Sequence, residues 1–523
     1  MPLDADQNAV ASEFDGARCV LAGPGAGKST TMVALIRNLL DRGVPTSEIK
    51  AVTFSSSMAK HLADKIGVDG IASTFHSLGY AICSEGERKP LEPEVRYRLM
   101  IKLVKQWNLD YHEFSHFISK MRREGITPEN ALADERDYGM CRAYALYEKT
   151  RAEGGWIDFD SMLADALVAL EKPEIRALYS PRYIIVDEAQ DTDNCQWRMM
   201  QLMAEKHGNI TIVGDCGQTI YGFRGAEPDN LINFEKWFPN GKTMFLGRNY
   251  RATRRLTKFV RENTPPGTPE ELRERMVAAR EEEGERIGMK MYWQLDDEAE
   301  AALVLAQKDP LRSIVLARTN HVVGVLERIC AQNKIKYHLL GKTSFWKQAE
   351  IAKALEALKA FVTSPTEMAM NMALPALEAK YAVDDRTERD NDALANLRIL
   401  RTYAKEHPQT REFLVYANKM VHRRNDARGV TLSTVHQAKG LEFNRVFIVG
   451  ANADGFPHKK GEPLEEARIW YVAISRAADS LRISFSGTPS PYLRKYLTEE
   501  ILSKLAESAH EVERLQIQGG LFS

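Results

Sequence analysis

A glycine-rich segment near the amino terminus constrains this chain more than any other feature. The segment AGPGAGKS, residues 22–29, follows the apolar run RCVLAG and continues into the helical pattern STTMVALIRNLLDRG. Glycines let a loop curl so that successive backbone N–H groups point at a phosphate, and the helix that follows presents its positive end to it. The segment departs from the strict P-loop pattern only at Ala22, and it predicts a nucleotide-binding α/β fold.

The residues of this loop have separate expected roles. Lys28 is expected to reach the β and γ phosphates, and the Ser29 hydroxyl is expected to ligate Mg²⁺. ATP and Mg²⁺ are therefore the expected cofactors. The alternative is a glycine-rich turn that only precedes a helix. The remaining positions expected to line the nucleotide are Gly23, Gly25, Ala26, Gly27 and Thr30.

The second half of the site is expected at the end of another buried strand, in YIIVDEAQD. Asp187 would hold the Mg²⁺ through water, and Glu188 would polarise the attacking water as general base. Hydrolysis also requires cations near the γ-phosphate, and Arg251 and Arg476 are the candidates. The alternative for the acidic pair is a strand end capped by carboxylates at the surface.

Short apolar runs separated by helical patterns recur along the chain, which is typical of parallel strands buried on both faces. They predict two sheets, one before and one after about residue 262. Helical, charge-rich sequence interrupts the first at 88–154 and the second at about 366–427. Segment 264–288 predicts a turn and then a highly charged helix, and it is the candidate linker. The apolar runs are AVTF, YIIVD, ITIVGD, SIVLAR, GVTLSTV and RVFIVG.

Composition adds limits to this fold. The 523 residues include 71 basic and 72 acidic side chains and 44% hydrophobic residues, as expected for a soluble globular protein of several domains. With a net charge of -1, a nucleic acid must be bound by a local patch. The six cysteines are scattered and no apolar run could span a membrane, so we expect a cytoplasmic enzyme with no membrane partner.

Nine segments then stand in a fixed order: LDADQNAV, AGPGAGKST, VTFSSSMAKHL, STFHSLGY, VDEAQDTD, VGDCGQTIYGFRGA, RNYR, TVHQAKGLEF and YVAISRA. Together they resemble the successive motifs of UvrD/Rep/PcrA-type superfamily 1 DNA helicases. The resemblance covers most of the chain. It implies two tandem RecA-like domains with helical insertions, ATP hydrolysis in the cleft between them, and 3′–5′ movement along single-stranded DNA.

The same resemblance implies domain boundaries. Residues 1–87 and 155–262 would form the first RecA-like domain, with 88–154 as a helical insertion. Residues 263–365 and 428–523 would form the second, with 366–427 as a reduced form of the family's 2B insertion.

Further nucleotide contacts come only from the resemblance. Gln7 would read the adenine, Gln218 would sense the γ-phosphate, Tyr250 would stack on the base and Glu442 would bind the ribose. Arg251 and Arg476 would be arginine fingers, the latter from the second domain. Two alternatives stay open: Gln7 lies three residues after Asp4 and can be a capping-box residue, and Tyr250 can be an ordinary half-buried aromatic.

Sequence-tolerant strand binding needs aromatic faces for bases and donors for phosphates. Matching motifs supply candidates on both domains, although each aromatic can instead be core packing under a loop. The candidates are Phe54, Thr74, Phe75, His76, Tyr221, Phe223 and Arg224 on the first domain, and Arg318, Thr434, His436 and Lys439 on the second.

Length is the main departure from the family. The stretch between 351 and 429 is short, and LRISFSG leads almost directly to PSPYLRKYL, so the extra hairpin that relatives use as a strand-separating pin is expected to be missing. We therefore expect an ATP-dependent helicase or translocase acting on single-stranded DNA and on single-strand/duplex junctions. The alternatives are a translocase that removes bound proteins with weak unwinding, and a P-loop regulatory ATPase that does not translocate.

The carboxyl-terminal tail predicts an amphipathic helix followed by a short exposed peptide. Its QGGLF sequence, with Gln518, Leu521 and Phe522, resembles the peptide by which bacterial replication and repair proteins bind the sliding clamp. The alternative is a frayed tail or local packing.

Overall fold

The chain divides into two compact units. Unit 1 comprises residues 1–248 and 269–275, and unit 2 comprises 249–268 and 276–523. The computed structural model describes residues 2–84, 89–133, 138–159, 161–220, 222, 228–341, 345–382, 388–421, 428–459 and 461–507. In this described part of the chain, no helix combines the length and the apolar character needed to cross a membrane.

Unit 1 is built on a six-stranded sheet in the order β3-β2-β6-β7-β1-β8. All its strand pairs are parallel. Because β6, β7 and β1 are neighbours in a parallel sheet, their carboxyl ends meet at one edge. The strands are β1 (Ala17–Ala22), β2 (Ile49–Thr53), β3 (Ala72–Thr74), β6 (Tyr183–Val186), β7 (Ile210–Gly214) and β8 (Lys242–Leu246).

Helices cover both faces of this sheet. One face carries α1, α2 and α3, whose apolar side chains join a core that includes Val20 and Ile185. Alternate residues of the same strands, Cys19 and Ile184, face a second core with α4, α9 and α11. The bounds are α1 (Ala5–Ser12), α2 (Lys28–Asp41), α3 (Ser56–Ile66), α4 (Phe75–Ser84), α9 (Ser161–Leu170), α10 (Pro173–Leu178), α11 (Asn194–Ala204), α12 (Pro228–Ile232) and α14 (Glu270–Arg275).

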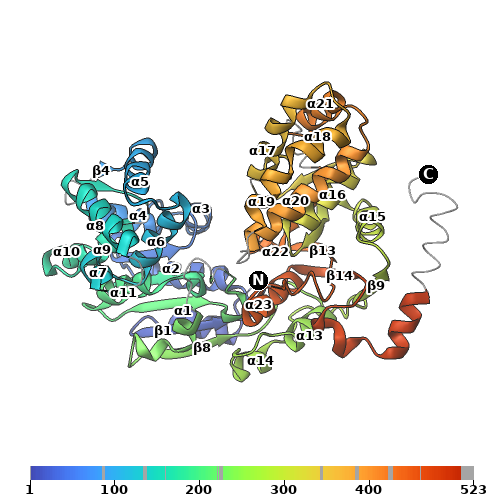
Figure 1. The fold of residues 1–523 in the computed structure, drawn as a ribbon. Coiled ribbons are helices and arrows are strands. Elements are labelled where there is room, and N and C mark those ends of the chain that lie inside the picture. The colour runs from blue at the N-terminus through green and yellow to red at the C-terminus, as the bar shows by residue number, and fades with distance from the viewer. Residues whose placement is uncertain are drawn as a thin grey trace. The chain divides into compact units, whose positions relative to one another are not determined.

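A helical insertion separates α4 from α9, as the charge-rich sequence predicted. It has its own core, in which Leu103, Phe114 and Tyr144 are buried. Its helices lie together in Figure 1. They are α5 (Pro93–Trp107), α6 (Tyr111–Arg123), α7 (Pro128–Ala133) and α8 (Tyr138–Glu153), and the two-residue strands β4 (Lys89–Pro90) and β5 (Trp156–Ile157) on either side of them pair with each other.

Unit 2 has a second six-stranded sheet, in the order β11-β12-β10-β13-β14-β9. Its strand pairs are also parallel. The strands are β9 (Gly288–Tyr292), β10 (Ser313–Ala317), β11 (Tyr337–Leu339), β12 (Val430–Thr434), β13 (Phe443–Val449) and β14 (Ala477–Ser486). The molecule therefore has the expected α/β architecture with two parallel sheets flanked by helices.

The helices of unit 2 include a compact group, α17 to α21, that packs with α16 around Trp346 and Tyr403 (Figure 1). The bounds in unit 2 are α13 (Arg254–Glu262), α15 (Leu295–Ala306), α16 (Asn320–Gln332), α17 (Ala349–Leu358), α18 (Thr366–Ala373), α19 (Pro375–Tyr381), α20 (Glu388–Lys405), α21 (Thr410–Val421), α22 (Val435–Ala438), α23 (Pro463–Ile474) and the 3₁₀ helix η10 (Pro491–Tyr496).

The prediction of a long charged helix in 264–288 is wrong. Only the six-residue α14 forms there, and the chain beyond it is extended. The backbone of Asn249 bonds to this segment twice, with N–H donating to Val277 at 2.8 Å and C=O accepting from Ala279 at 2.7 Å. These long-range bonds replace the local bonds of a helix. The chain crosses between the units at 248/249, 268/269 and 275/276, and only the last two crossings lie within the candidate linker.

Residues 249–262, which we assigned to the first RecA-like domain, are grouped with unit 2. The Thr253 N–H donates to the Ala478 carbonyl at 3.2 Å, and α13 packs on β14.

Candidate functional site

The phosphate loop connects β1 to α2 in unit 1. Gly25 and Gly27 have φ angles of 67° and 76°, a region that glycine adopts without steric cost. The Gly23 N–H donates to the Leu246 carbonyl at 2.8 Å, which attaches the start of the loop to β8. Gly27 is the N-cap residue of α2 and has no side chain to occupy the first N–H groups of that helix. These groups are the ones that bind an anion at a helix start.

Lys28 begins α2 and lies beside the acidic pair. Its Nζ is 3.7 Å from Glu188 Oε1. Asp187 directly follows β6 and is buried, and its Oδ1 accepts from the Glu188 N–H at 2.9 Å. Glu188 has a φ of 52°, so the chain turns sharply at the strand end. The predicted lysine, Mg²⁺ carboxylate and general base are thus brought together.

A third strand end completes this acidic cluster. Asp215 follows β7, and its Oδ2 accepts from Gln218 Nε2 at 2.7 Å. Gln190 links the two strand ends, because its Nε2 donates to Glu188 Oε2 and its Oε1 accepts from the Asp215 N–H at 3.0 Å. Sequence analysis did not select Asp215 or Gln190. The signal for Asp215 is its place directly after an apolar strand, as for Asp187.

At this edge of the sheet, carboxylates outnumber cationic side chains. Burial, and then the neighbouring Glu188 carboxylate, raise the pKa of Asp187 above its ordinary value, whereas Lys28 lowers it. Burial also raises the pKa of Asp215, and again Lys28 acts in the opposite direction. Two buried carboxylates and the half-buried Glu188 face one lysine, an environment that a divalent cation would stabilise.

Gln7 forms the capping box of α1, and its side chain also contacts the phosphate loop. Its backbone N–H donates to Asp4 Oδ1 at 2.7 Å, and its Oε1 accepts from the Asp4 N–H at 3.2 Å. The buried Nε2 donates to the Ala26 carbonyl at 3.1 Å. Gln7 therefore ties α1 to the phosphate loop, and its predicted contact with adenine stays a prediction. Of the remaining loop residues, Ser29 is half-buried and Thr30 is exposed.

Unit 2 brings together a second set of predicted nucleotide residues. Arg251 Nε donates to Glu442 Oε2 at 2.6 Å, and its Nη1 donates to the Ser475 carbonyl at 3.0 Å. The neighbouring Arg476 is only 1% exposed. Its guanidinium donates to the carbonyls of Val472 and Leu441 and to Ser475 Oγ. Both predicted arginine fingers thus belong to one cluster, on a unit different from that of Lys28.

Tyr250 lies next to this cluster in the chain and is half-buried. This degree of burial suits both a ring that stacks on a base and an ordinary packed aromatic, so its role stays a prediction.

The predicted strand-binding residues of unit 1 differ in exposure. Phe54 follows β2 and is 36% exposed, whereas Phe75 is 4% exposed and packs in the core, so its predicted contact with a base stays a prediction. Thr74 is buried, and its Oγ1 accepts from the Ser77 N–H at 3.1 Å. The other predicted contacts of this unit, Tyr221, Phe223 and Arg224, lie outside the described residues.

His76 has an aromatic partner that sequence analysis missed. The ring of Phe159 stacks on it with centroids 4.1 Å apart and planes 10° from parallel. Phe159 is 67% exposed, so much of its ring surface is open to solvent. The two residues are 83 positions apart in the sequence, and no local pattern pairs them.

A buried ionic network fixes the backbone next to Phe159. Asp158 accepts from Arg122 Nη1 at 2.7 Å and from the Tyr147 hydroxyl at 2.5 Å. Arg122 also pairs with Glu148 at 2.5 Å. Although burial alone would raise the pKa of Asp158, Arg122 and the hydrogen bonds lower it to about 2. The helical insertion therefore positions the stacked pair through Asp158.

In unit 2, the predicted strand-binding residues follow neighbouring strands. Thr434 ends β12 and is buried, while His436 and Lys439 are half-buried in and after α22. Arg318 follows β10 but is buried, and its Nε and Nη2 donate to the Glu466 carboxylate at 3.0 and 2.5 Å. In this structure the Arg318 guanidinium therefore serves an internal ion pair.

Residues 499–507 at the carboxyl terminus are helical, as predicted for this tail. Gln518, Leu521 and Phe522 lie outside the described residues.

Comparisons with known proteins agree with this geometry. The chain matches the family model of the UvrD/REP helicase N-terminal domain over residues 3–239. It matches the UvrD-like helicase C-terminal domain over residues 244–387 and 384–488. These matches cover both sheets.

Two curated relatives span nearly the whole chain. The ATP-dependent DNA helicase PcrA of Staphylococcus aureus strain Mu50 is 25% identical, over 99% of this chain and 88% of the relative. The protein of the same name from Staphylococcus epidermidis strain ATCC 35984 is 25% identical, over 96% and 87%. A solved C-terminal domain of a possible DNA helicase from Lactobacillus plantarum WCFS1 has a TM-score of 0.25 at 13% identity, over 48% of this chain and 96% of that one, which is too low to compare folds.

Proposed function

Because this chain belongs to the UvrD/REP helicase family, we propose that it is an ATP-dependent DNA helicase that translocates 3′ to 5′ on single-stranded DNA. The observation that carries the proposal is the meeting of three strand ends in unit 1. They bring Lys28 to within 3.7 Å of Glu188 and place Asp187 and Asp215 beside them. This set of groups is the one that phosphoryl transfer to water requires.

The residues present fit Mg²⁺ and ATP. The left-handed glycines of the loop and the start of α2 supply N–H donors for phosphates. Ser29 and Asp187 would hold Mg²⁺, which accepts few protein ligands when substrate phosphates and water complete its shell. In the described part of the chain, no group of three or more potential metal-ligating side chains forms a separate metal site. When bound, Mg²⁺ would neutralise charge that develops on the phosphate oxygens.

Glu188 is the proposed general base. Its carboxylate faces Lys28 and accepts from Gln190. The bond from Gln190 would hold this carboxylate toward an attacking water molecule while Lys28 binds the phosphates. Its role is to hold that water and accept its proton at an Oε atom.

Gln218 and the arginine cluster would link hydrolysis to movement. Gln218 is held by Asp215 at the same strand ends as Glu188, which suits a side chain that senses the γ-phosphate. Arg251 and Arg476 belong to unit 2, and we propose that they complete the site as arginine fingers only when the two units close on ATP. Hydrolysis would then reopen the two units. Because the affinity of each unit for the strand would differ between the open and closed states, each cycle would move the strand.

The proposed track uses side chains at the carboxyl edges of both sheets. On unit 1, Phe54 and the stacked pair His76–Phe159 offer exposed aromatic surface for bases. On unit 2, His436 and Lys439 follow β12. Single-stranded DNA and single-strand/duplex junctions are therefore the proposed partners.

A translocase that removes proteins from single strands, with weak unwinding, is a second candidate. In the described residues, β14 ends at Ser486 and the chain enters η10 at Pro491, which leaves no room there for a strand-separating hairpin. A pin that splits base pairs would then have to come from another element or from another protein.

The test is the ATPase rate with and without single-stranded oligonucleotides, together with an unwinding trace on a duplex with a 3′ single-stranded tail. We expect strong stimulation of the ATPase by single strands, and little processive unwinding by the isolated chain would favour the translocase. An ATPase that does not respond to single strands would support a P-loop regulatory ATPase. Normal processive unwinding would show that the missing hairpin was given too much weight.

A further inference from the structure

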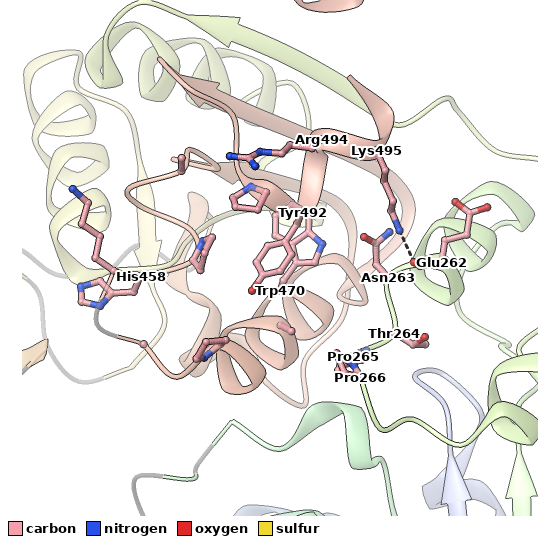
Figure 2. A pocket seen from close by; sticks show the side chains of 17 residues that line it. Glu262, Asn263, Thr264, Pro265, Pro266, His458, Trp470, Tyr492, Arg494 and Lys495 are labelled. Atoms are coloured by element: carbon pink, nitrogen blue, oxygen red, sulfur yellow. Dashed lines mark hydrogen bonds between the residues drawn. The ribbon is translucent and has the colours of Figure 1, made fainter. Parts of the chain in front are cut away.

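Two cavities of unit 1 lie at the amino edge of its sheet, where the strands begin. The phosphate loop and the acidic cluster lie at the opposite edge, where the strands end. A cavity of about 750 Å³ in unit 2 contains Trp470 and Tyr492, between the loops that follow β13 and β14 (Figure 2). That cavity is at the edge of the proposed DNA track, whereas the two cavities of unit 1 have no part in the proposed function.

The first of the two, the Trp237 cavity, has a volume of about 460 Å³, and Trp237, Phe238 and Arg198 are among the residues that line it. Trp237 is held in place, because its Nε1 donates to Asn230 Oδ1 and its carbonyl accepts from Gln201 Nε2, both at 3.0 Å. A fixed aromatic wall beside an arginine is typical of the sites in protein interfaces that hold an apolar side chain.

The second, the Lys50 cavity, has a volume of about 340 Å³ and is more polar, with Lys50, Ser73 and Lys206 in its lining. Ser73 Oγ is buried and, among the described residues, has no hydrogen-bond partner. Lys50 is half-buried, its Nζ donates to the Gly70 carbonyl at 3.3 Å, and burial lowers its pKa. A carboxylate in this cavity would accept from Ser73 and offset the cost of burying the lysine charge.

The helix α10 joins the two cavities into one surface. Arg176 lines the Trp237 cavity, and Leu178, two residues later, lines the Lys50 cavity. The chain after α11 divides in the same way, because Glu205 lines the first cavity and Lys206 the second. Leu178 is 70% exposed, so the surface also presents an apolar side chain to solvent.

Charge on this surface favours an acidic ligand. Its two carboxylates already have donors, because Glu205 pairs with Arg176 Nη1 at 2.7 Å and Glu48 accepts from the Arg182 N–H at 3.0 Å. Three cations of the surface form no ion pair within the described part of the chain, and a partner's carboxylates would complement them. They are Lys50, Arg198 and Lys206.

We propose that this surface binds an acidic peptide segment of a partner protein. A carboxylate of the segment would lie in the Lys50 cavity, and an apolar side chain would lie against Trp237. The inference goes beyond the proposed function, because neither cavity contains a residue proposed to bind ATP or DNA. Since the surface is at the amino edge of the sheet, a bound segment would leave the nucleotide site open.

The test uses a fluorescein-labelled peptide of sequence DDLEFDD and fluorescence anisotropy with the full chain. We expect saturable binding that weakens about tenfold or more in Lys206→Glu and in Arg198→Glu, because like charges then face each other. A peptide with amides in place of the carboxylates (NNLQFNN) and one without the apolar side chains (DDAEADD) should each bind at least about tenfold more weakly than DDLEFDD.

Two control variants make the result specific. Lys206→Arg keeps the charge and should bind DDLEFDD as the unchanged chain does. Lys105→Glu makes the same charge change at an exposed position of α5, outside both cavities, and should alter binding little. Circular dichroism and the unfolding midpoint check that each variant is folded.

Several outcomes would overturn the surface. They are no saturable binding of DDLEFDD up to about 1 mM, equal binding of the acidic and amide peptides, and an equal loss in Lys206→Glu and Lys105→Glu, which indicates a general field effect. Equal weakening of oligothymidylate and peptide binding by Lys206→Glu would make the surface a nucleic-acid site, and a change of oligomeric state in light scattering would make it a contact between two copies.

The same chains separate this inference from the proposed function. Lys206→Glu and Arg198→Glu should keep an ATPase that single strands stimulate, because both residues are at the amino edge of the sheet. If the ATPase responds but no peptide binds, the surface is wrong and the motor stands. If peptides bind as expected but the ATPase ignores single strands, the proposed function is wrong and the surface stands.

Discussion

Lys28 and Glu188 contact each other, yet their substitutions should have different effects on ATP turnover. Glu188→Gln keeps the size of the side chain but removes the proton acceptor, so turnover should fall by at least about a hundredfold with ATP binding retained. Lys28→Ala removes the cation that reaches the phosphates, so nucleotide binding itself should weaken. Fluorescent-nucleotide binding and steady-state ATPase rates measure both. Ordinary turnover in Glu188→Gln would show that another group is the base.

Phe159 should contribute to the affinity for DNA and little to the stability of the fold. Its ring is 67% exposed and stacks on His76, so Phe159→Ala removes a face for a base without opening the core. Stacking on an aromatic side chain contributes about 1–3 kcal/mol per base, which predicts a loss of affinity for single strands of about fivefold or more. Fluorescence anisotropy with a labelled oligothymidylate measures it.

Leu178 provides the control, because it is 70% exposed in the same unit and its side chain in α10 offers no aromatic face to a base. Leu178→Ala should leave the affinity unchanged. Equal affinity of Phe159→Ala and the unchanged chain would show that the stacked pair does not contact DNA.

At the scale of elements, a buried carboxyl joins α15 to the sheet of unit 2. Glu298 Oε1 accepts from the Gly450 N–H at 2.6 Å and from Ser484 Oγ at 2.8 Å, at the ends of β13 and β14. Burial raises the pKa of Glu298 to about 7, against 4.5 for the free group, and these hydrogen bonds oppose the shift only in part. The carboxyl is therefore protonated more readily in the folded chain than in the unfolded chain.

This difference predicts a pH dependence of stability. A group with a raised pKa stabilises the fold fully below its unfolded value, and that stability is lost as the pH rises through the folded value. Between pH 4.5 and 8 the loss should be on the order of 3 kcal/mol. Glu298→Gln stays neutral and should lose this part of the dependence. Urea unfolding of unit 2 at pH 5 and pH 8, for both chains, measures it; parallel curves would contradict the assignment.

Element boundaries show where sequence patterns were sufficient. Each continuous apolar run named in the sequence lies in a strand, because such runs are buried on both faces of a parallel sheet. The strands that were missed are the inner strand β14, the short pair β4 and β5, and the outer strands of the two sheets, β3, β8, β9 and β11. An outer strand is covered less completely, so residues such as Lys242 and Lys290 are tolerated in it and the apolar signal is weak.

At the scale of the whole molecule, the carboxyl-terminal tail is expected to bind a partner protein and to take no part in ATP hydrolysis. We propose that QGGLF, with Gln518, Leu521 and Phe522, binds a sliding clamp. Deleting residues 517–523 should abolish clamp binding and leave the single-strand-dependent ATPase unchanged, because the deleted peptide lies after both sheets in the chain. Co-sedimentation or surface plasmon resonance with a purified bacterial clamp measures the first. No clamp binding by the intact chain would end the proposal.

By itself, the sequence determined the groups that carry local signals. The phosphate loop, the acidic pair after β6 and the order of the motifs depend on neighbours in the chain, so their residue types and spacing identify them. Only the tertiary structure decided which distant groups meet. It joined Gln190 to Asp215 and stacked Phe159 on His76. It also buried Arg318 against Glu466, 148 residues away, and formed the cavity at Trp470. Such pairs are set by strand order and helix packing, which no short window of sequence contains.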